Sequence, residues 1–339
     1  MTLATLSTCL GLFLPATLCA QTVVVVQEGP GKVAIVSAQD PSNSKLIDVG
    51  AKPHELELSP DGRTAYVSNF GLLEANHKVG QPGTTISVID IARGVERTRY
   101  ALPTGAIAPH GVKLRPNKFR ELFTNSEEGR EEMIVFDAAS GAVRRTYALP
   151  PGVHNFLFNL DGSALFAFTM KGDLFRIDPD TGKVTAQGTV PSPRGLAWTA
   201  GATQLLVSGK GQLLFVDPAT LSIDQRFVNL GVGQIFYPTA TSDSRWILAP
   251  AVIDGVLLVV DAKTGAVTHR IETGSPLLAA LTPDGKHAWI SNVFVPAGMF
   301  GPGTKQRSGG VVVLDLETFQ TTVIPGIPDT NGLAIATMR

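Results

Sequence analysis

The sequence predicts an all-β fold, a seven-bladed β-propeller built from four-stranded blades. The first observation is a phrase of strand, tight turn and strand that returns about every 40 residues, a period typical of propeller blades. The second is that the first and last copies are incomplete and complement each other. The third is a composition rich in Gly and Pro with only 17% charged residues, which favours many short strands joined by tight turns.

The returning phrase is clearest at residues 52–69, Lys-Pro-His-Glu-Leu-Glu-Leu-Ser-Pro-Asp-Gly-Arg-Thr-Ala-Tyr-Val-Ser-Asn. Its Pro-Asp-Gly turn fixes the register, because Asp61 lies seven residues after His54 and the same step relates the later copies. We call the position of His54 the ring position, since the first strand of each blade should run beside the central channel. In chain order this position is filled by His54, His110, His154, Arg194, Phe236, Leu277 and Asn331.

The predicted strands follow this phrase along the chain. Three strands, at 23–26, 32–37 and 45–49, come first, and the second blade has strands at 54–59, 64–69, 84–91 and 95–102. Later blades are expected at 110–148, 154–188, 193–228, 235–272 and 277–324, and a single strand at 330–337 ends the chain. The three N-terminal strands and the one C-terminal strand together make a blade, which closes the ring and removes exposed sheet edges.

Residues 3–20 form an uncharged apolar run, which we interpret as part of a signal peptide covering residues 1–20. An uncleaved anchor is the alternative, but the run is short for a membrane span. The propeller domain then covers residues 21–339 and is periplasmic or secreted, with no membrane span in the mature chain. Cys9 and Cys19 both fall in the leading segment, so the mature protein would lack thiol nucleophiles and cysteine-ligated metal.

The charge balance and the acidic turns carry little functional information. With 28 basic and 29 acidic residues, the chain gives no electrostatic reason to expect nucleic acid or an anionic membrane as a partner. Acidic residues that end the third strands are interpreted as structural, because Asp accepts hydrogen bonds from backbone amides in such turns. These residues are Asp90, Asp137, Asp178, Asp217, Asp261 and Asp315.

The repeats resemble those of the YVTN family of seven-bladed propellers. The resemblance is carried by residues 59–69, Ser-Pro-Asp-Gly-Arg-Thr-Ala-Tyr-Val-Ser-Asn, followed by Ile-Ser-Val-Ile-Asp at 86–90. A second good copy lies at 282–292 with 311–315, and the resemblance spans residues 22–339. It implies the propeller fold, but similar propellers include lactonases, streptogramin-type lyases, periplasmic redox accessories and surface proteins, so it does not choose an activity.

The ring position breaks the symmetry of the repeats. His54, His110, His154 and Arg194 come from four successive blades and predict a polar arc at one channel mouth. Phe236 and Leu277 make the next part of the ring apolar, and Asn331 closes it beside His54. Apolar surface together with a few polar groups is typical of a small-molecule site.

Two long loops are expected to lie over the same face, at 70–83 and 293–308, where function tends to collect. The first carries Glu74 and His77, and the loop of the third blade carries Glu127. The predicted ligand-binding set is His54, His110, His154, Arg194, Phe236, Asn331, His77 and Glu127.

Three interpretations of the histidines remain open at this point. They can be structural residues of strand-start turns. They can hold a divalent ion such as Zn²⁺, Cu²⁺ or Mn²⁺ through His54, His110 and His154, with Glu127 or Glu74 as a further ligand. Alternatively, His110 can act as a general acid–base without metal, while Arg194 holds a carboxylate or developing oxyanion.

We therefore expect an exported propeller that binds a small molecule or a divalent metal ion at the channel mouth. The alternatives are a lactonase- or lyase-like enzyme that uses the same residues, with His110 and Arg194 as catalytic candidates, and a non-catalytic scaffold with a protein partner. A concave pocket with imidazoles aimed at one point favours the first two, and a large apolar patch favours the scaffold.

Overall fold

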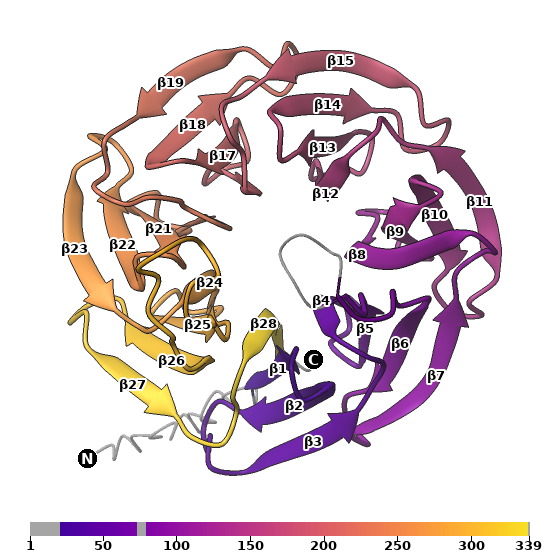
Figure 1. Cartoon of the computed structure of the whole chain (residues 1–339), viewed down its shortest axis with the longest axis horizontal. Helices are drawn as coiled ribbons and strands as arrows, with labels where there is room; N and C mark the ends of the chain where they lie inside the picture. The colour runs from indigo at the N-terminus through magenta and orange to yellow at the C-terminus, as the bar shows by residue number, and fades with distance from the viewer. Residues whose placement is uncertain (1–20, 73–78, 338–339) are drawn as a thin grey trace, which may run out of the picture.

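The computed structural model describes residues 21–72 and 79–337, which form seven four-stranded antiparallel sheets around a central channel (Figure 1). Every regular element in these ranges is a strand, and the seven-bladed all-β prediction is confirmed. None of the described residues belongs to a helix of the length and apolarity that a membrane span needs.

The strands follow the chain blade by blade. Blade 1 contains β28 (Thr330–Thr337), β1 (Gln21–Gln27), β2 (Lys32–Ser37) and β3 (Ser44–Asp48). Blade 2 contains β4 (Pro53–Leu58), β5 (Thr64–Asn69), β6 (Thr85–Asp90) and β7 (Val95–Ala101). Blade 3 contains β8 (Ala106–Leu114), β9 (Glu121–Gly129), β10 (Glu132–Asp137) and β11 (Val143–Ala148). Blade 4 contains β12 (Val153–Phe158), β13 (Leu165–Thr169), β14 (Asp173–Ile177) and β15 (Val184–Thr189).

Among the remaining blades, blades 5 and 6 have shorter inner strands, of four and two residues. Blade 5 contains β16 (Gly195–Trp198), β17 (Leu205–Gly209), β18 (Gln212–Val216) and β19 (Ile223–Phe227). Blade 6 contains β20 (Thr239–Ala240), β21 (Trp246–Ala251), β22 (Val256–Asp261) and β23 (Val267–Glu272), and blade 7 contains β24 (Pro276–Leu281), β25 (His287–Asn292), β26 (Gly310–Asp315) and β27 (Thr321–Ile324). The sixth blade was expected to start at 235, but its inner strand begins at Thr239, directly after Pro238, which has no N–H to donate to a ladder.

The ring closes as the incomplete end segments predict. β1 pairs with β28 in antiparallel register, with Val24 opposite Ala334 and Val23 opposite Ile335. The innermost strand of blade 1 thus comes from the C-terminal end of the chain and the other three from residues 21–48. Pairing the two ends in one sheet makes the ring a continuous circle of blades.

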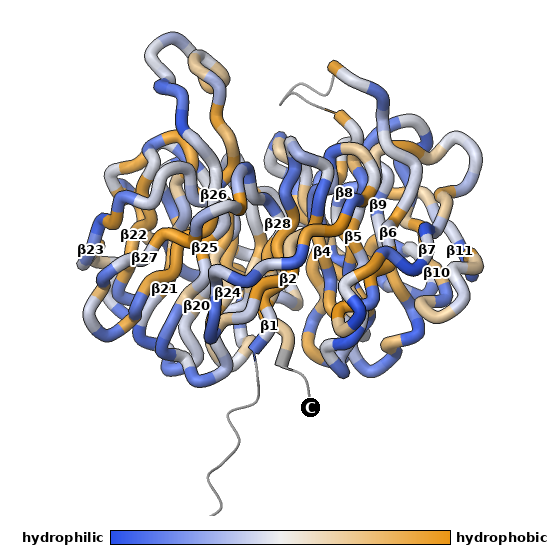
Figure 2. Tube along the Cα trace, turned by 90° about the horizontal axis from the view of Figure 1, so that it is seen from below, coloured by the Kyte–Doolittle hydropathy of each residue, from blue (hydrophilic) through white to orange (hydrophobic). Residues whose placement is uncertain are grey.

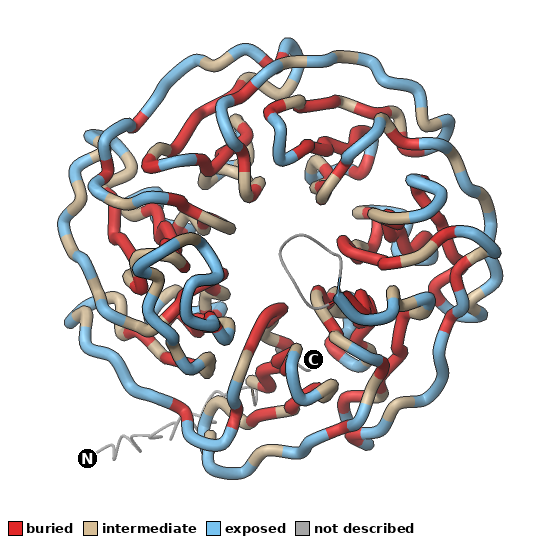
Figure 3. Tube along the Cα trace, viewed as in Figure 1, coloured by how far each residue is buried: buried red, intermediate tan, exposed pale blue. Residues whose placement is uncertain are grey.

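The core lies between adjacent blades. Middle strands are almost entirely buried, whereas outer strands alternate between exposed and half-buried residues, and Figure 3 shows this as a blue outer circle around red inner strands. One cluster contains Tyr66 and Tyr100 of blade 2 with Phe136 of blade 3, so aromatic rings fill the wedge between neighbouring sheets. This packing makes each inner strand a rigid support for the residue at its start.

The repeated turns behave as the acidic residues predict. Asp261 Oδ1 accepts hydrogen bonds from the backbone N–H groups of Lys263 (3.1 Å) and Thr264 (2.7 Å). Asp61 Oδ1 accepts one from the Arg63 N–H at 3.1 Å in the Pro-Asp-Gly turn. These carboxylates are used by the fold, which separates them from the candidate functional groups.

The loops gather over one face. Figure 2 shows the segment between β25 and β26 rising from the upper face, on the side where the ends of the 70–83 loop also lie, whereas β28 runs down to the C-terminus at the lower face. Pro53 pairs with Asn69, so the start of the inner strand lies at the same face as the end of the second strand. The 293–308 loop and the described ends of the 70–83 loop therefore lie at the face where the inner strands of the blades begin.

Candidate functional site

Ring-position residues lie on β-bulges at the start of the inner strands. The ladder slips between Pro53 and Leu56 in blade 2, between Pro109 and Val112 in blade 3, and between Val153 and Asn155 in blade 4. The same irregularity occurs in blades 7 and 1. A bulge inserts one extra residue and redirects its side chain, so these positions depart from simple strand alternation.

A left-handed residue lies two positions before five of the seven ring positions. The φ angles are 46° at Lys52, 53° at Ala108, 80° at Gly152, 50° at Ser192 and 49° at Asp329. Four of these five residues are not glycine, and this conformation is unfavourable for residues with a side chain. The surrounding structure therefore imposes the sharp turn that brings each chain segment to the channel mouth.

Polar side chains of the second strands hold the histidine backbones in place. Ser68 Oγ of blade 2 donates to the His110 carbonyl at 2.7 Å, and Asn125 Nδ2 of blade 3 donates to the His154 carbonyl at 3.1 Å. Asn125 Oδ1 also accepts the Gly111 N–H at 2.9 Å. The backbones of His110 and His154 are thus each tied to the preceding blade, which sets the spacing between these imidazoles and their neighbours.

The three imidazoles of the polar arc lie side by side. The ring centroids of His54 and His110 are 4.5 Å apart, and those of His110 and His154 are 4.2 Å apart. Phe70 packs 5.3 Å from His54, and Phe168 packs 5.6 Å from His154. The sequence register thus identified three residues that the fold brings together from three separate blades.

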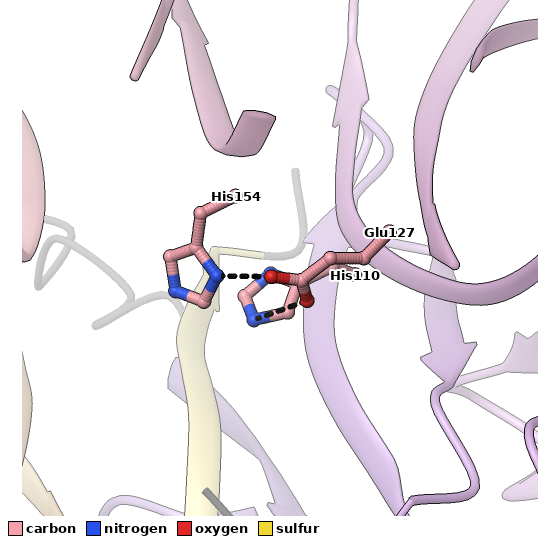
Figure 4. Close-up of side chains that lie close together, drawn as sticks. All are labelled: His110, Glu127 and His154. Carbon is pink, nitrogen blue, oxygen red and sulfur yellow. Dashed lines mark hydrogen bonds and ion pairs between the residues drawn. The ribbon is translucent and has the colours of Figure 1, made fainter. Parts of the chain in front are cut away.

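His110, Glu127 and His154 form the group best placed to hold a metal ion. One ligand atom from each residue lies within 4.8 Å of the other two. Figure 4 shows the Glu127 carboxylate facing both imidazoles, with Oε1 at 2.7 Å from His154 Nδ1 and Oε2 at 4.0 Å from His110 Nε2. Glu127 reaches this place because β8 and β9 are both nine residues long and continue past the ring position.

His54 makes a different set of contacts from the other two histidines. Its Nδ1 lies 2.9 Å from Asn331 Nδ2, and the same amide nitrogen donates to Glu28 Oε2 at 2.9 Å. Glu28 Oε2 is 3.8 Å from His54 Nδ1. The predicted ring contact between Asn331 and His54 is therefore present, whereas Glu28, at the turn after β1, was not identified from the sequence.

A second ring lies directly below the first, at the residue after each ring position. Glycine alternates with a larger residue through most of this second ring. In spatial order from blade 1 to blade 7, its residues are Gly332, Glu55, Gly111, Asn155, Gly195, Tyr237 and Leu278. At Gly111 a Cβ atom would lie 2.6 Å from Asn155 Oδ1, and at Gly195 it would lie 2.8 Å from Tyr237 Cα. The glycines therefore make room for side chains from alternate blades to meet in the channel.

Glu55 is the centre of this second ring. Its Oε2 accepts a hydrogen bond from Lys113 Nζ at 3.0 Å, and its Oε1 accepts one from Asn155 Nδ2. The Tyr237 hydroxyl lies 3.4 Å from Oε1 and 3.1 Å from Asn155 Nδ2. His110 Nδ1 is 3.7 Å from the same Oε1, which connects this buried network to the candidate metal ligands above it.

Electrostatic interactions keep Glu55 and Lys113 charged at the centre of the second ring. Burial is the largest single influence on Glu55 and opposes its ionisation, but Lys113, His54 and the hydrogen bond from Asn155 together outweigh burial and hold the pKa of this carboxyl below its usual value. Burial likewise disfavours the Lys113 ammonium, yet Glu55 and Glu57 raise its pKa above the usual value. Burial and the Glu55 charge raise the pKa of Tyr237 well above its usual value, so this hydroxyl stays protonated as a donor.

Below the histidines the channel contains a cavity of about 220 Å³. Glu55, Lys113, Asn155 and Tyr237 line one part of it, and apolar residues such as Leu278 line another. Sequence reasoning missed this second ring, although a signal existed: aligned by the turn, the residue after each ring position alternates between glycine and a larger side chain.

The other predicted site residues lie in different surroundings. Phe236 and Leu277 pack with Val252 and Val295 under the 293–308 loop, as the apolar arc predicts. Arg194 donates to two backbone carbonyls, those of Pro193 (2.8 Å) and Met170 (3.4 Å), and burial lowers the pKa of its guanidinium. Glu74 and His77 lie outside the described residues.

Comparisons with known proteins support the architecture. No protein-family model matches the sequence, and no curated protein matches it significantly. Among many similar solved structures is one described as Kuenenia stuttgartiensis hydrazine synthase, with a TM-score of 0.70 and 16% sequence identity. The match covers 93% of this chain and 100% of that chain. At this identity the likeness shows the propeller fold alone.

Proposed function

We propose that this propeller binds one divalent transition-metal ion at the upper channel mouth through His110, Glu127 and His154. The observation that carries the proposal is the convergence of two imidazoles and one carboxylate from two adjacent blades, with one atom of each within 4.8 Å of the others. Zn²⁺ bonds of about 2.0–2.1 Å place ligand atoms roughly 3.3 Å apart. The required contraction is therefore a small movement of side chains.

The donor set indicates the kind of ion. Two imidazole nitrogens and one carboxylate oxygen suit Zn²⁺ and other first-row divalent ions, and the residues after Cys19 offer no thiolate. Three protein ligands leave at least one coordination position for water or a small molecule. The proposed role is thus a binding centre for a small ligand on a metal, supported by a rigid propeller.

Glu55 supports this centre from below. A ligating histidine usually donates its second ring N–H to a carboxylate, which orients the imidazole and increases its basicity. The 3.7 Å separation of His110 Nδ1 and Glu55 Oε1 fits that arrangement, with His110 Nε2 on the Glu127 side. Lys113 and Asn155 in turn hold the Glu55 carboxylate in place.

Metal analysis of the purified full chain tests the proposal. We expect one equivalent of metal per chain by elemental analysis, and Zn²⁺ binding in competition with a chromophoric chelator. His110→Ala, Glu127→Gln and His154→Ala should each weaken Zn²⁺ binding by about 100-fold or more, because each removes one ligand. His269→Ala is the matched control, since His269 stacks on Phe319 at a centroid distance of 3.8 Å, on an outer strand. Absence of stoichiometric metal from the wild type, or equal affinity in the ligand variants, contradicts the proposal.

We also propose that the protein is exported and is a member of the YVTN type of propeller. The uncharged apolar run at 3–20 and the absence of Cys beyond residue 19 support export, and the copies at 59–69 and 282–292 support the family. Cell fractionation followed by mass spectrometry of the N-terminus should find a chain that begins at Gln21 outside the cytoplasm. A cytoplasmic chain that retains residues 1–20 contradicts the export proposal.

A further inference from the structure

The three histidines of the polar arc are chemically different, and the difference starts at Asn331. Its amide nitrogen lies 2.9 Å from Glu28 Oε2 and 2.9 Å from His54 Nδ1. A carboxylate oxygen only accepts hydrogen bonds, so Glu28 determines which end of the amide faces this pocket. The NH₂ group then gives one hydrogen to Glu28 and the other to His54 Nδ1.

This arrangement fixes the tautomer of His54. An Nδ1 atom that accepts a hydrogen bond carries no proton, so the neutral imidazole carries its proton on Nε2. The Nε2–H makes no hydrogen bond within the described ranges, 21–72 and 79–337. His110 has a different neighbour, because its Nδ1 lies 3.7 Å from Glu55 Oε1, and a nearby carboxylate favours a proton on that nitrogen.

The two neighbouring imidazoles therefore suit two different roles. His110 presents a basic Nε2 towards Glu127 at 4.0 Å, as a metal ligand requires. In His54, both nitrogens are unsuited to ligation, because Nδ1 is occupied by Asn331 and Nε2 carries the proton. Its ring centroid is nevertheless only 4.5 Å from that of His110, one of the three proposed metal ligands.

We propose that His54 is a hydrogen-bond donor to an oxyanion bound at the metal, and that Asn331 and Glu28 position it for this role. This inference rests on the proposed metal site and names its ligand class, a small molecule that presents a negatively charged oxygen, of which a carboxylate is the simplest. A metal ion and an N–H donor that face the same oxygen both favour negative charge on it. The sequence-based expectation that His54 is itself a ligand is replaced by this role.

The tautomers can be measured without metal. Long-range ¹H–¹⁵N spectra of the metal-free chain labelled with ¹⁵N-histidine should show His54 protonated at Nε2, with the resonance identified by its loss in His54→Phe. Asn331→Leu should remove the preference, because it removes the donor to Nδ1. A wild-type His54 protonated at Nδ1 overturns the inference and leaves the proposed metal site intact.

Metal and ligand binding then separate the two roles. His54→Phe keeps the ring that packs between Phe70 and His110, and it should leave Zn²⁺ affinity unchanged, whereas His110→Ala loses it. In the Co²⁺-loaded protein, His54→Phe should weaken binding of acetohydroxamate by about tenfold, roughly the value of one hydrogen bond to a charged group. Binding of imidazole, which brings no oxyanion, should be unchanged.

Two outcomes overturn the inference. If His54→Phe lowers Zn²⁺ affinity as strongly as His110→Ala, His54 is a ligand. If acetohydroxamate binds equally to both proteins, His54 makes no hydrogen bond to the bound oxygen. Failure of the wild type to bind any metal overturns the proposed function and this role together, and it is distinguished by elemental analysis.

Discussion

Gly111 joins the packing of the channel to the candidate metal site, and its replacement by alanine tests that connection. Gly111 follows His110 and lies where alternate blades meet. A Cβ atom here would be 2.6 Å from Asn155 Oδ1, 2.9 Å from Asn125 Oδ1 and 2.9 Å from Phe156 Cε1. Two of these neighbours are held by other contacts, since Asn155 donates to Glu55 and Asn125 donates to the His154 carbonyl.

The expected cost follows from this overpacking. Inserting a methyl group into a tightly packed site costs about 1–3 kcal/mol, and three contacts shorter than a normal Cβ approach place Gly111→Ala near the middle of that range, about 2 kcal/mol. For a domain of this size the change corresponds to a decrease of about 3 °C in the melting temperature. Displacement of Asn125 should also shift His154 relative to His110 and weaken Zn²⁺ binding by about tenfold.

Urea unfolding followed by tryptophan fluorescence, together with chelator competition for Zn²⁺, measures both effects. Gly152→Ala is the control, because a Cβ there meets only Thr169 Cγ2 at 3.9 Å, although φ is 80°. It should lose about 1 kcal/mol from backbone strain and leave Zn²⁺ affinity unchanged. If Gly111→Ala unfolds like the wild type and binds Zn²⁺ equally well, the coupling between second-ring packing and ligand spacing is refuted.

Three further predictions concern pH and the backbone anchors. Burial raises the pKa of Glu57 to about 7, so the free energy of unfolding decreases progressively as pH rises from about 4.5 to 7. Relative to wild type, Glu57→Gln should therefore gain stability between pH 5 and pH 8, and a loss of stability over that range in urea titrations contradicts this. The Arg115 guanidinium holds the pKa of Asp180 at about 2, so the ion pair stabilises the fold above the pKa of the unfolded carboxyl and loses this effect as pH falls towards 2. The unfolding free energy of Asp180→Asn should therefore differ from that of wild type more at pH 7 than at pH 3, and a constant difference argues against the ion pair. Asn125→Ala removes the donor to the His154 carbonyl and the acceptor for the Gly111 N–H. We expect the free energy of unfolding to decrease by about 1–3 kcal/mol and calorimetry to show weaker Zn²⁺ binding, whereas unchanged affinity would show that Asn125 does not set the ligand spacing.

The sequence by itself determined the fold and the identity of the ring. The period of the repeats, the Pro-Asp-Gly turns and the complementary chain ends predicted seven four-stranded blades and their closure through β1 and β28. The same register placed His54, His110 and His154 at equivalent positions of adjacent blades. Such features are readable because they depend on local spacing and strand alternation, which the repeat copies several times along the chain.

Only the tertiary structure decided how these residues are used. Glu127 joins His110 and His154 because β8 and β9 continue beyond the ring position. His54 contacts Asn331, which is 277 residues away in the chain, and Asn331 in turn binds Glu28, which is 303 residues from it. The bulges and the left-handed residues at Lys52 and Ala108 carry no consistent sequence signature. The direction of a side chain at a bulge depends on contacts between blades of the closed ring. These contacts give His54, His110 and His154 different hydrogen-bond and charge environments although they occupy equivalent positions of the repeat.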